Sequence, residues 1–459
     1  MELDPLLISR IQFAFVVSFH ILFPAFTIGL AAFIAVLEGL YLKTKNPAYL
    51  RLSKFWLKIF AVSFGMGVVS GIVMAFQFGT NWSAFSFATA NFMGPVLAYE
   101  ALTAFFLEAT FLGVLLFGRN KVPQGMHFFS ACVVAFGTTL STFWIISANS
   151  WMQTPDGVEM RDGMIFVTNW ADAIFNPSFM VRLPHMVLGA FLTTAFFVIG
   201  VASWYLLKRR HLETSRIMFS MTMWLILVLA PLQIVVGDLV GLNMVQYQPA
   251  KVAAMEGAWE TKDGAPLVLF GIPDQEQATT HYEVAIPNLA SLILTHEWDG
   301  TVLGLEEWAQ EDWPYVPATF WLFRIMVGIG FVMAAIGLWS AWKRWRGDLY
   351  DAPVFLRVCT LSLPLGFIAT LTGWIVAEMG RYPWIVYDTM RIEDGVTPSL
   401  TGGVALASLL VYILTYAVIF GAGSYIILRL VREGPQEEEP EPSIEDPLRR
   451  PMRPLSAVE

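Results

Sequence analysis

The sequence has little charge for its length of 459 residues. Asp, Glu, Lys and Arg make up only 14% of it, whereas soluble globular domains carry roughly 25%. Hydrophobic residues reach 56%, and the net charge of −9 excludes a nucleic-acid-binding protein, which would present a basic surface. A soluble core cannot hold so much apolar surface, so the composition indicates a polytopic membrane protein.

Cysteine and histidine are also scarce. Cys132 and Cys359 lie in apolar stretches far apart in sequence, which predicts inert buried thiols rather than a disulfide framework or a zinc site. No CxxCH motif is present to attach a haem covalently. Only His20 and His185 of the six histidines fall in long apolar segments, too few for the haem and copper ligands of a haem–copper oxidase. No two histidines have the spacing on one helix that a four-helix cytochrome b needs.

Long apolar runs are abundant. A transmembrane helix needs roughly 20 mainly apolar residues. Glu2 and Asp4, with no small-residue cleavage site after the first run, predict that no signal peptide is removed. Nine segments satisfy the length rule: Ile11–Leu42, Ile59–Phe78, Met93–Gly118, Phe128–Ala148, Leu183–Leu207, Ile217–Gly237, Trp313–Trp342, Val358–Ala377 and Pro398–Leu428.

The connecting loops predict the orientation of these nine helices. Loops after the first, third, fifth and seventh segments hold fifteen Lys and Arg residues, against six in the alternate loops. Because positively charged loops stay in the cytoplasm, the N-terminus is predicted outside and the C-terminus in the cytoplasm. The sequence therefore predicts an all-α polytopic protein with about nine transmembrane helices.

Two segments are predicted to lie outside the membrane. Residues 242–312 hold twelve acidic residues against Lys251 and Lys262, which indicates a folded outer domain. Residues 433–459 are rich in Pro and Glu, which predicts a disordered cytoplasmic tail. The remaining residues form helices one to six (1–241) and seven to nine (313–432). No internal repeat is visible, which counts mildly against an inverted-repeat transporter.

Several polar side chains lie where lipid is expected. A charge at the bilayer centre costs roughly 2.5–3.5 kcal/mol, so each one needs a reason. With the predicted orientation, five potential ligands or proton carriers gather in the outer half of the membrane: His20, Glu100, His185, Met326 and Glu378. Imidazole, thioether and carboxylate groups serve as haem axial ligands and proton relays.

Glu100 and Glu108 share one predicted helix. An i, i+8 spacing places them about 80° apart around a regular α-helix and about 12 Å apart along it. Such a pair can pass protons through a helix bundle, and Ser141 on the fourth segment could bridge the two. The alternative is that both glutamates only make interhelical hydrogen bonds.

Several longer motifs are specific to one family. Between Arg10 and about Arg432 the chain resembles subunit I of the cytochrome bd-type quinol oxidases. The matching stretches are Gln77–Trp82, Glu100 with Phe105–Glu108, Ala148–Gln153, Phe323–Met326, Gly373–Trp384, Lys251–Thr261 and Leu269–Gln275.

This resemblance implies three haems and no copper. One would be a low-spin haem b between His185 and Met326; two would be high-spin haems, with His20 and Glu378 as their single axial ligands. Arg324 and Arg381 would pair with haem propionates, and Trp374 would lie between the haems. Which high-spin haem each ligand binds, and whether the third haem is d or a second b, stay open.

The resemblance also implies substrates and partners. Lys251 and Glu256 would contact quinol on the outer loop, which is of the short type, and the cyanide-insensitive branch stays open. Quinol oxidation at the outer face would be coupled to four-electron reduction of dioxygen to water. Protons would be taken up from the cytoplasm through Glu100, Glu108 and Ser141, without pumping. A second membrane subunit, a small single-span accessory subunit and a bacterial inner-membrane location are implied, with no nucleic-acid partner.

Two other functions remain alternatives. A proton-coupled transporter would explain Glu100 and Glu108 but gives no role to His185 and Met326. A haem-bearing subunit without oxidase turnover is the second alternative. It differs from an oxidase only in that the haems bound by His20 and Glu378 would have no open coordination face. Visible spectroscopy of the purified protein separates these three.

Overall fold

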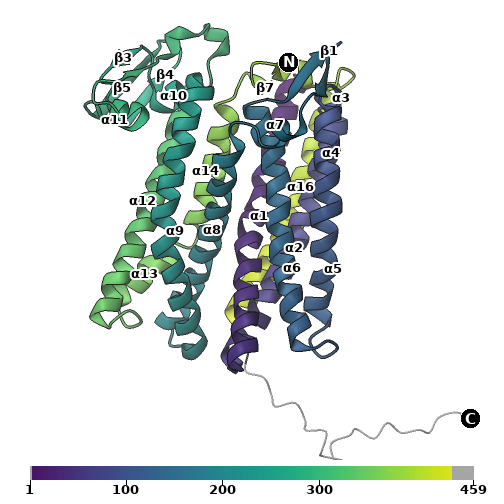
Figure 1. Cartoon of the computed structure of the whole chain (residues 1–459), viewed down its shortest axis with the longest axis vertical. Helices are drawn as coiled ribbons and strands as arrows, with labels where there is room; N and C mark the ends of the chain where they lie inside the picture. The colour runs from purple at the N-terminus through teal and green to yellow at the C-terminus, as the bar shows by residue number, and fades with distance from the viewer. Residues whose placement is uncertain (1–2, 437–459) are drawn as a thin grey trace, which may run out of the picture.

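The computed structural model describes residues 3–436 and consists mainly of long helices running side by side, with a smaller domain at one end (Figure 1). Within this described part, nine helical segments are long and apolar enough to cross a membrane. The predicted all-α fold with nine spans is therefore confirmed. Residues 437–459, which include most of the predicted disordered tail, lie outside the described residues.

Seven of the nine spans are single helices or contain one dominant helix. The first six of these are α1 (Pro5–Thr44), α2 (Pro47–Thr80), α6 (Gln124–Gln153), α8 (Phe179–Leu207), α9 (Leu212–Tyr247) and α12 (Val316–Arg346). The ninth span is α16 (Gly402–Glu433). The third span is divided into α4 (Ala90–Glu100), one π-helical turn, η1 (Ala101–Phe105), and α5 (Phe106–Phe117).

Most of the observed helices are longer than the predicted apolar segments. The sixth segment was expected to end at Gly237, but α9 continues to Tyr247 and has 36 residues. At about 1.5 Å per residue such a helix exceeds a hydrocarbon core of about 30 Å. Apolar composition marks only the part in lipid, whereas helical hydrogen bonding continues beyond it. Helices α1 and α2 each begin with a proline at the first helical position. Asp4 caps the N-terminus of α1, and Asn46 caps that of α2.

The eighth segment is interrupted rather than continuous. It comprises α13 (Pro353–Leu361) and α14 (Leu365–Met379), separated by a turn that ends at Pro364. Proline has no backbone N–H to continue the helical ladder, which accounts for the interruption. The prediction of one helix from Val358 to Ala377 was wrong in this respect.

Close helix contacts bring the centre of the bundle together. A Cβ atom on Gly29 of α1 would lie 2.5 Å from Thr194 Oγ1 of α8, and that hydroxyl donates to Phe26 O at 2.7 Å. A Cβ atom on Gly366 of α14 would lie 2.4 Å from Thr193 Cα. Small residues at these positions let α1, α8 and α14 approach closely, as is common in membrane bundles.

A smaller domain follows α9. It comprises α10 (Pro249–Glu256), β3 (Lys262–Asp263), β4 (Leu267–Asp274), β5 (Thr279–Ile286), α11 (Leu289–Thr295), β6 (Thr301–Val302) and the 3-10 turns η2 (Leu305–Glu307) and η3 (Gln310–Asp312). Strands β4 and β5 form an antiparallel hairpin, and β3 pairs with β6.

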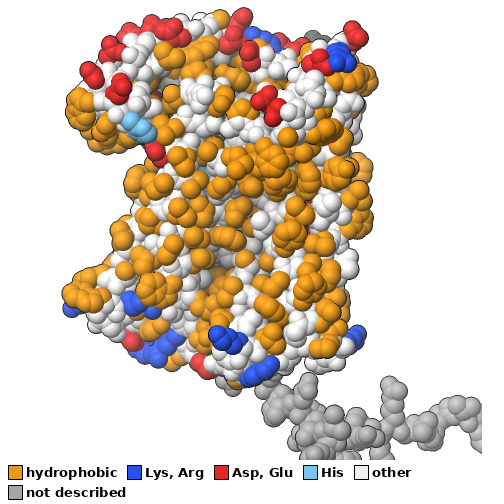
Figure 2. Space-filling model, viewed as in Figure 1, with side chains coloured by type: hydrophobic (Ala, Val, Ile, Leu, Met, Phe, Trp, Pro, Cys, Tyr) orange, Lys and Arg blue, Asp and Glu red, His pale blue; other side chains and the backbone are white. Residues whose placement is uncertain are grey.

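Two short hairpins lie at the same end of the molecule as this domain (Figure 1). One hairpin pairs β1 (Val158–Arg161) with β2 (Met164–Val167), and the other pairs β7 (Trp384–Val386) with β8 (Met390–Arg391). Three short helices complete this end: α3 (Ser83–Ala88), α7 (Trp170–Ile174) and α15 (Ile392–Gly395). In Figure 2 acidic side chains gather at this end, while Lys and Arg side chains gather at the other. This distribution agrees with the predicted orientation, which remains a prediction.

Candidate functional site

His20 is held in a defined orientation by the neighbouring helix. Its Nδ1 atom lies 2.9 Å from Ser70 Oγ of α2. The Ser70 hydroxyl donates to Met66 O and Gly67 O at 2.9 and 3.0 Å. Since its one proton is directed to those carbonyl groups, Ser70 accepts a hydrogen bond from His20 Nδ1–H. The Nε2 atom of His20 is then unprotonated and can bind a metal ion.

His185 and Met326 occupy opposite corners of a ring of four helices. Helix α8 packs against α9 and α14, and α12 also packs against α9 and α14. His185 lies on α8, with its ring beside Gly237 of α9, and Met326 lies on α12, with its sulfur beside Gly373 of α14. Gln233 of α9 donates to His185 O at 3.1 Å and lies 3.2 Å from His185 Nδ1. Imidazole and thioether groups are both ligands that haem iron binds.

A glycine lies beside each of three candidate ligands. Added Cβ atoms would lie 3.2 Å from His20 Cε1 at Gly71, 3.4 Å from His185 Cε1 at Gly237, and 2.6 Å from Met326 Sδ at Gly373. A side chain at any of these positions would crowd the ligand. All four candidate ligands, including Glu378, are only half-buried, so each keeps surface on which a metal-bearing group can approach.

Glu378, at the end of α14, is fixed by two residues of α6 and by Arg381, three residues further along the chain. Asn149 and Gln153 of α6 donate to its Oε1 atom at 2.9 and 3.4 Å. Arg381 forms an ion pair with its other oxygen. Arg182 of α8 donates to Asn149 Oδ1 at 2.6 Å, which links a second guanidinium to the same carboxylate.

Two guanidinium groups and one lysine side chain lie around Glu378. Arg182, Lys251 and Arg381 all act electrostatically on its carboxyl group. Arg182 Nη1 and the Nε and Nη1 atoms of Arg381 are buried and have no hydrogen-bond partner among the described residues. An unpaired buried donor is costly, and surplus buried positive charge more so. The cluster is therefore built to receive additional anionic oxygens.

Arg324 of α12 contacts the smaller domain. Its guanidinium donates to Val268 O at 2.8 Å and Met255 O at 2.6 Å, and lies 3.5 Å from Glu256 Oε2. The Phe320 ring stacks on it at 3.4 Å. These contacts fasten the domain to α12, a role that the sequence did not suggest. Pairing of Arg324 with a propionate stays a prediction.

Trp374 lies one helical turn before Glu378 on α14 and is half-buried. Residues four apart lie on the same face of a helix, so Trp374 and Glu378 share the face of α14 that the resemblance assigns to the haems. Its place between haems stays a prediction.

The two glutamates of the third span share one face, which differs from the prediction. The π-helical turn lies between them. Such a turn adds one residue to the α-helical frame, which changes the expected angle from about 80° to about 20°. Ser141 of α6 donates to Glu100 Oε1 at 2.6 Å, while Glu108 Oε1 is buried without a hydrogen-bond partner among the described residues. Nothing in the hydropathy of the segment signalled this turn.

Gly137 of α6 makes room for Glu108. A Cβ atom on Gly137 would lie 2.7 Å from Glu108 Cγ. We expect Gly137→Ala to displace the Glu108 side chain and reduce turnover several-fold without changing the visible spectrum. Gly113→Ala is the matched control, since nothing lies within 4 Å of the Cβ that it adds. Equal turnover of both variants would show that the position of Glu108 does not matter.

Lys251 and Glu256 both lie on α10 and are buried, with relative exposures of 2% and 7%. Lys251 Nζ donates to Gln153 Oε1 at 2.5 Å and Gln248 Oε1 at 2.7 Å. Burial, together with the nearby Arg182 and Arg381, holds the pKa of Lys251 well below its usual value. Burial raises the pKa of Glu256, against the opposing effect of Arg324. Both groups therefore have a weakened preference for the charged form.

Gln153 connects two of these groups. Its amide nitrogen donates to Glu378 and its amide oxygen accepts from Lys251. The candidate quinol contact on α10 is thus joined to the candidate ligand on α14 through one side chain of α6. Gln153 ends the predicted Ala148–Gln153 motif, but its sequence position alone gave it no role.

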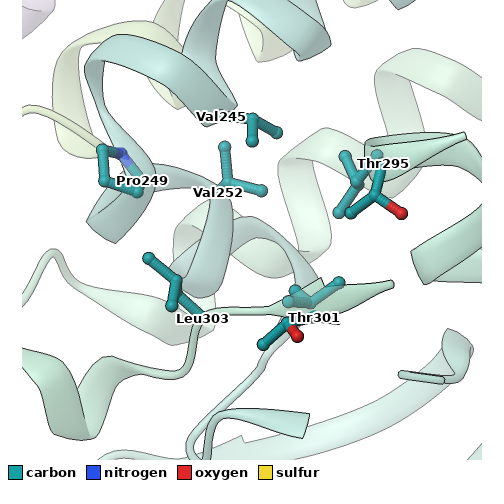
Figure 3. A pocket seen from close by; sticks show the side chains of 8 residues that line it. Val245, Pro249, Val252, Thr295, Thr301 and Leu303 are labelled. Atoms are coloured by element: carbon teal, nitrogen blue, oxygen red, sulfur yellow. The ribbon is translucent and has the colours of Figure 1, made fainter. Parts of the chain in front are cut away.

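A small apolar cavity of about 50 Å³ lies between the end of α9 and the smaller domain (Figure 3). Val245, Pro249, Val252 and Leu303 are among its lining residues, and neither Lys251 nor Glu256 lines it. Pockets for ligands of ordinary size measure about 300–1,000 Å³. The cavity is too small for a quinol ring in this conformation.

Comparison with known proteins identifies the family. The family model described as cytochrome bd terminal oxidase subunit I matches residues 8–435. The chain belongs to this family. Cytochrome bd ubiquinol oxidase subunit 1 of Bacillus subtilis (strain 168) is 35% identical to it over 447 residues, covering 95% of each chain. Cytochrome bd-II ubiquinol oxidase subunit 1 of Escherichia coli (strain K12) is 31% identical, covering 95% of this chain and 99% of its own length.

A solved structure has the same fold. The bd oxidase from Geobacillus thermodenitrificans superposes with a TM-score of 0.87 at 28% sequence identity, covering 94% of this chain and 99% of that one. The resemblance found in the sequence is confirmed. The chain is an oxidoreductase subunit and a multi-pass protein of the bacterial inner membrane.

Membership of a cytochrome family implies haem cofactors, and the residues present fit them. His20, His185, Met326 and Glu378 offer the donor atoms that haem iron binds. The glycines beside three of them keep the ligand side chains uncrowded. The unpartnered donors of Arg182 and Arg381 suit haem propionates. Ser70, Asn149, Gln153 and Arg182 complete the site, and the sequence alone did not assign them roles.

Proposed function

We propose that this subunit couples the oxidation of quinol at the outer face to the four-electron reduction of dioxygen to water. The observation that carries the proposal is the cation-rich cluster around Glu378, which leaves guanidinium donors without partners close to a carboxylate ligand. A proton-coupled transporter has no use for this cluster and gives no role to His185 and Met326. The names of two relatives, which include ubiquinol oxidase, support quinol as the electron donor.

Each candidate ligand has its own task. His185 and Met326 would hold a low-spin haem b, since thioether opposite imidazole raises the reduction potential. His20 and Glu378 would each be a single ligand of a high-spin haem, b with either d or a second b, and no copper would be involved. When bound, the haems supply electron storage and dioxygen binding. The protein orients the ligands through Ser70, Asn149 and Gln153.

The outer domain would receive the quinol. Glu256, with its pKa raised by burial, suits the acceptance of a quinol proton, and Lys251 can donate to a quinol oxygen. Both side chains are buried, so contact with a quinol requires that they become uncovered. Gln153 would then link the state of Lys251 to Glu378.

Replacement of Glu256 tests this assignment. We expect Glu256→Gln to lower turnover with quinol at least about 10-fold, because an amide cannot accept the proton, while the visible spectrum stays unchanged. Glu283→Gln is the matched control, since Glu283 is exposed in the same domain. Steady-state oxygen consumption measures both. Equal turnover of the two variants would contradict the role of Glu256.

Glu108, Ser141 and Glu100 would carry protons from the cytoplasm, so that charge separation arises from uptake without pumping. The shared face of the two glutamates and the 2.6 Å hydrogen bond from Ser141 to Glu100 support this relay. A cavity of about 350 Å³ lies between α2, α5 and α16 at the opposite end from the outer domain. Its lining includes Leu115, two helical turns beyond Glu108, which suits access of water to that end of α5.

Replacement of Glu108 tests the relay. We expect Glu108→Gln to reduce turnover at least about 10-fold, since the amide keeps the shape but cannot release a proton. Haem content should stay intact. Exposed Glu297→Gln serves as control. Turnover equal to the control would leave the two glutamates as interhelical hydrogen-bonding groups.

The proposal includes protein partners. A second membrane subunit would complete the oxidase, as the subunit number in the relatives' names suggests. A small single-span accessory subunit would be expected as well.

A visible spectrum tests the whole proposal. Purified complex reduced with dithionite should show low-spin b bands, and carbon monoxide should shift a separate high-spin signal. A far-red band would indicate haem d, and its absence a second haem b. No carbon monoxide response would favour a haem subunit without oxidase turnover. A featureless spectrum from intact protein would contradict the oxidase and favour a transporter.

A further inference from the structure

The β4–β5 hairpin presents one packed face and one uncovered apolar face. On the packed side, Val268 is buried and Thr280 Oγ1 accepts a hydrogen bond from Trp259 Nε1 at 2.9 Å. The uncovered side chains are 42–81% exposed: Leu269, Phe270, Ile272, Tyr282, Val284 and Ile286. A contiguous exposed apolar patch of this kind marks a contact surface.

The hairpin lies directly against a membrane-spanning helix. The Phe270 ring meets Trp321 of α12 edge to face, with centroids 5.2 Å apart. Arg324 Nε, in the third turn of α12, donates to Val268 O at 2.8 Å. Strand β4 therefore lies beside the first turns of α12 rather than above them.

The position of the hairpin relative to the membrane boundary follows from the length of α12. Lys343, Arg344 and Arg346 close α12 and belong at the membrane surface opposite the outer domain. A hydrocarbon core of about 30 Å corresponds to about 20 residues at 1.5 Å per residue. Counting back from Lys343 places the other boundary near Phe323. Since Arg324 binds Val268 O, strand β4 lies at the level of this boundary.

The apolar surface of the hairpin continues that of α12. Ile325, Val327 and Phe331 of α12 are exposed apolar side chains just beyond the Arg324 contact. In Figure 2 acidic side chains lie along the top and left of the outer domain, hydrophobic side chains gather at its lower left, and a histidine lies on its lower side. Lipid that covers α12 therefore also reaches the hairpin.

We propose that the β4–β5 hairpin is an interfacial membrane anchor, whose exposed apolar face lies in the lipid leaflet on the side of the outer domain. Tyr282, the most exposed of the six, is of a residue type enriched at membrane interfaces. His281 and Asp274, 3.8 Å apart at the turn end, are polar groups that belong at the headgroup level rather than deeper. The anchor would hold the outer domain close to the layer where a lipid-soluble substrate resides.

Spin labelling of the complete oxidase tests the anchor. Val284→Cys, in a background with Cys132 and Cys359 replaced by Ala, carries a nitroxide in lipid nanodiscs. Power saturation compares its accessibility to oxygen, which concentrates in lipid, with that to a water-soluble nickel chelate. Glu297→Cys is the control, because Glu297 is an exposed acidic residue of the same domain. We expect the oxygen-to-nickel ratio at Val284 to exceed that at Glu297 several-fold.

Other outcomes are equally decisive. A ratio equal to that at Glu297 would place the hairpin in water, and exclusion of both reagents would show that a protein surface covers it; either result overturns the anchor. Leu269→Cys on β4 repeats the test if Val284→Cys lowers the yield of complex. The experiment uses no turnover, so its result is independent of the proposed oxidase mechanism.

Discussion

Replacing His185 with Ala is expected to remove the low-spin b bands from the reduced-minus-oxidised spectrum and to lower quinol oxidation at least about 100-fold. His185 lies on α8 and Met326 on α12, within the group of helices α8, α9, α12 and α14. A thioether alone is a weak ligand, so loss of the imidazole should release or mis-ligate the group held there. The carbon monoxide-sensitive signal should remain, because His20 and Glu378 lie on other helices.

The control for this variant is His281→Ala. His281 is an exposed histidine on β5, and its side chain lies 3.8 Å from Asp274. We expect the spectrum and turnover of this control to be unchanged. Intact low-spin bands in His185→Ala would contradict the assignment of His185 and leave Met326 without a partner ligand. A loss of all haem signals together would indicate unfolding rather than a specific ligand role.

Replacing Glu378 with Gln is expected to have a second large effect, on both haem content and stability. The carboxylate is the anionic partner of Arg381 and lies in the field of Arg182 and Lys251. An amide keeps the shape but leaves these cations without compensation. Removing one member of a buried charge pair typically costs 3–5 kcal/mol, so about this loss in the free energy of unfolding is expected.

Two measurements separate the ligand role from the electrostatic one. The carbon monoxide difference spectrum reports the high-spin site, and thermal inactivation of the purified complex reports stability. We expect part of the carbon monoxide response to be lost and inactivation to occur at lower temperature. Glu393→Gln, on an exposed position of α15, should change neither. Reduced stability with a full carbon monoxide response would show that Glu378 balances charge without binding iron.

The sequence by itself determined the membrane class, the number of spans and the residues worth testing. A lipid bilayer requires each span to be mainly apolar along its length, and this property can be read directly from the sequence. Against that background His20, His185 and Glu378 are conspicuous, and rare polar residues in lipid usually have a function. Family motifs then supplied their expected roles, and the family itself is confirmed.

Only the tertiary structure decided how these residues are held. Ser70, Asn149 and Arg182 act across helix interfaces, and their contacts depend on packing that local hydropathy does not encode. Arg182 in particular precedes the predicted fifth segment, which begins at Leu183, although it lies inside α8 and reaches the Glu378 cluster.

The π-helical turn shows the same limit for backbone geometry. A spacing of eight residues predicts an angle only if the helix is regular, and one added residue rotates Glu108 relative to Glu100 by about 100°. Arg324 gives a parallel example, because its carbonyl partners belong to a domain more than fifty residues earlier in the chain. Composition and periodicity are local properties of the chain, whereas ligand orientation, buried charge balance and the position of the hairpin at the membrane boundary arise only when distant segments pack together.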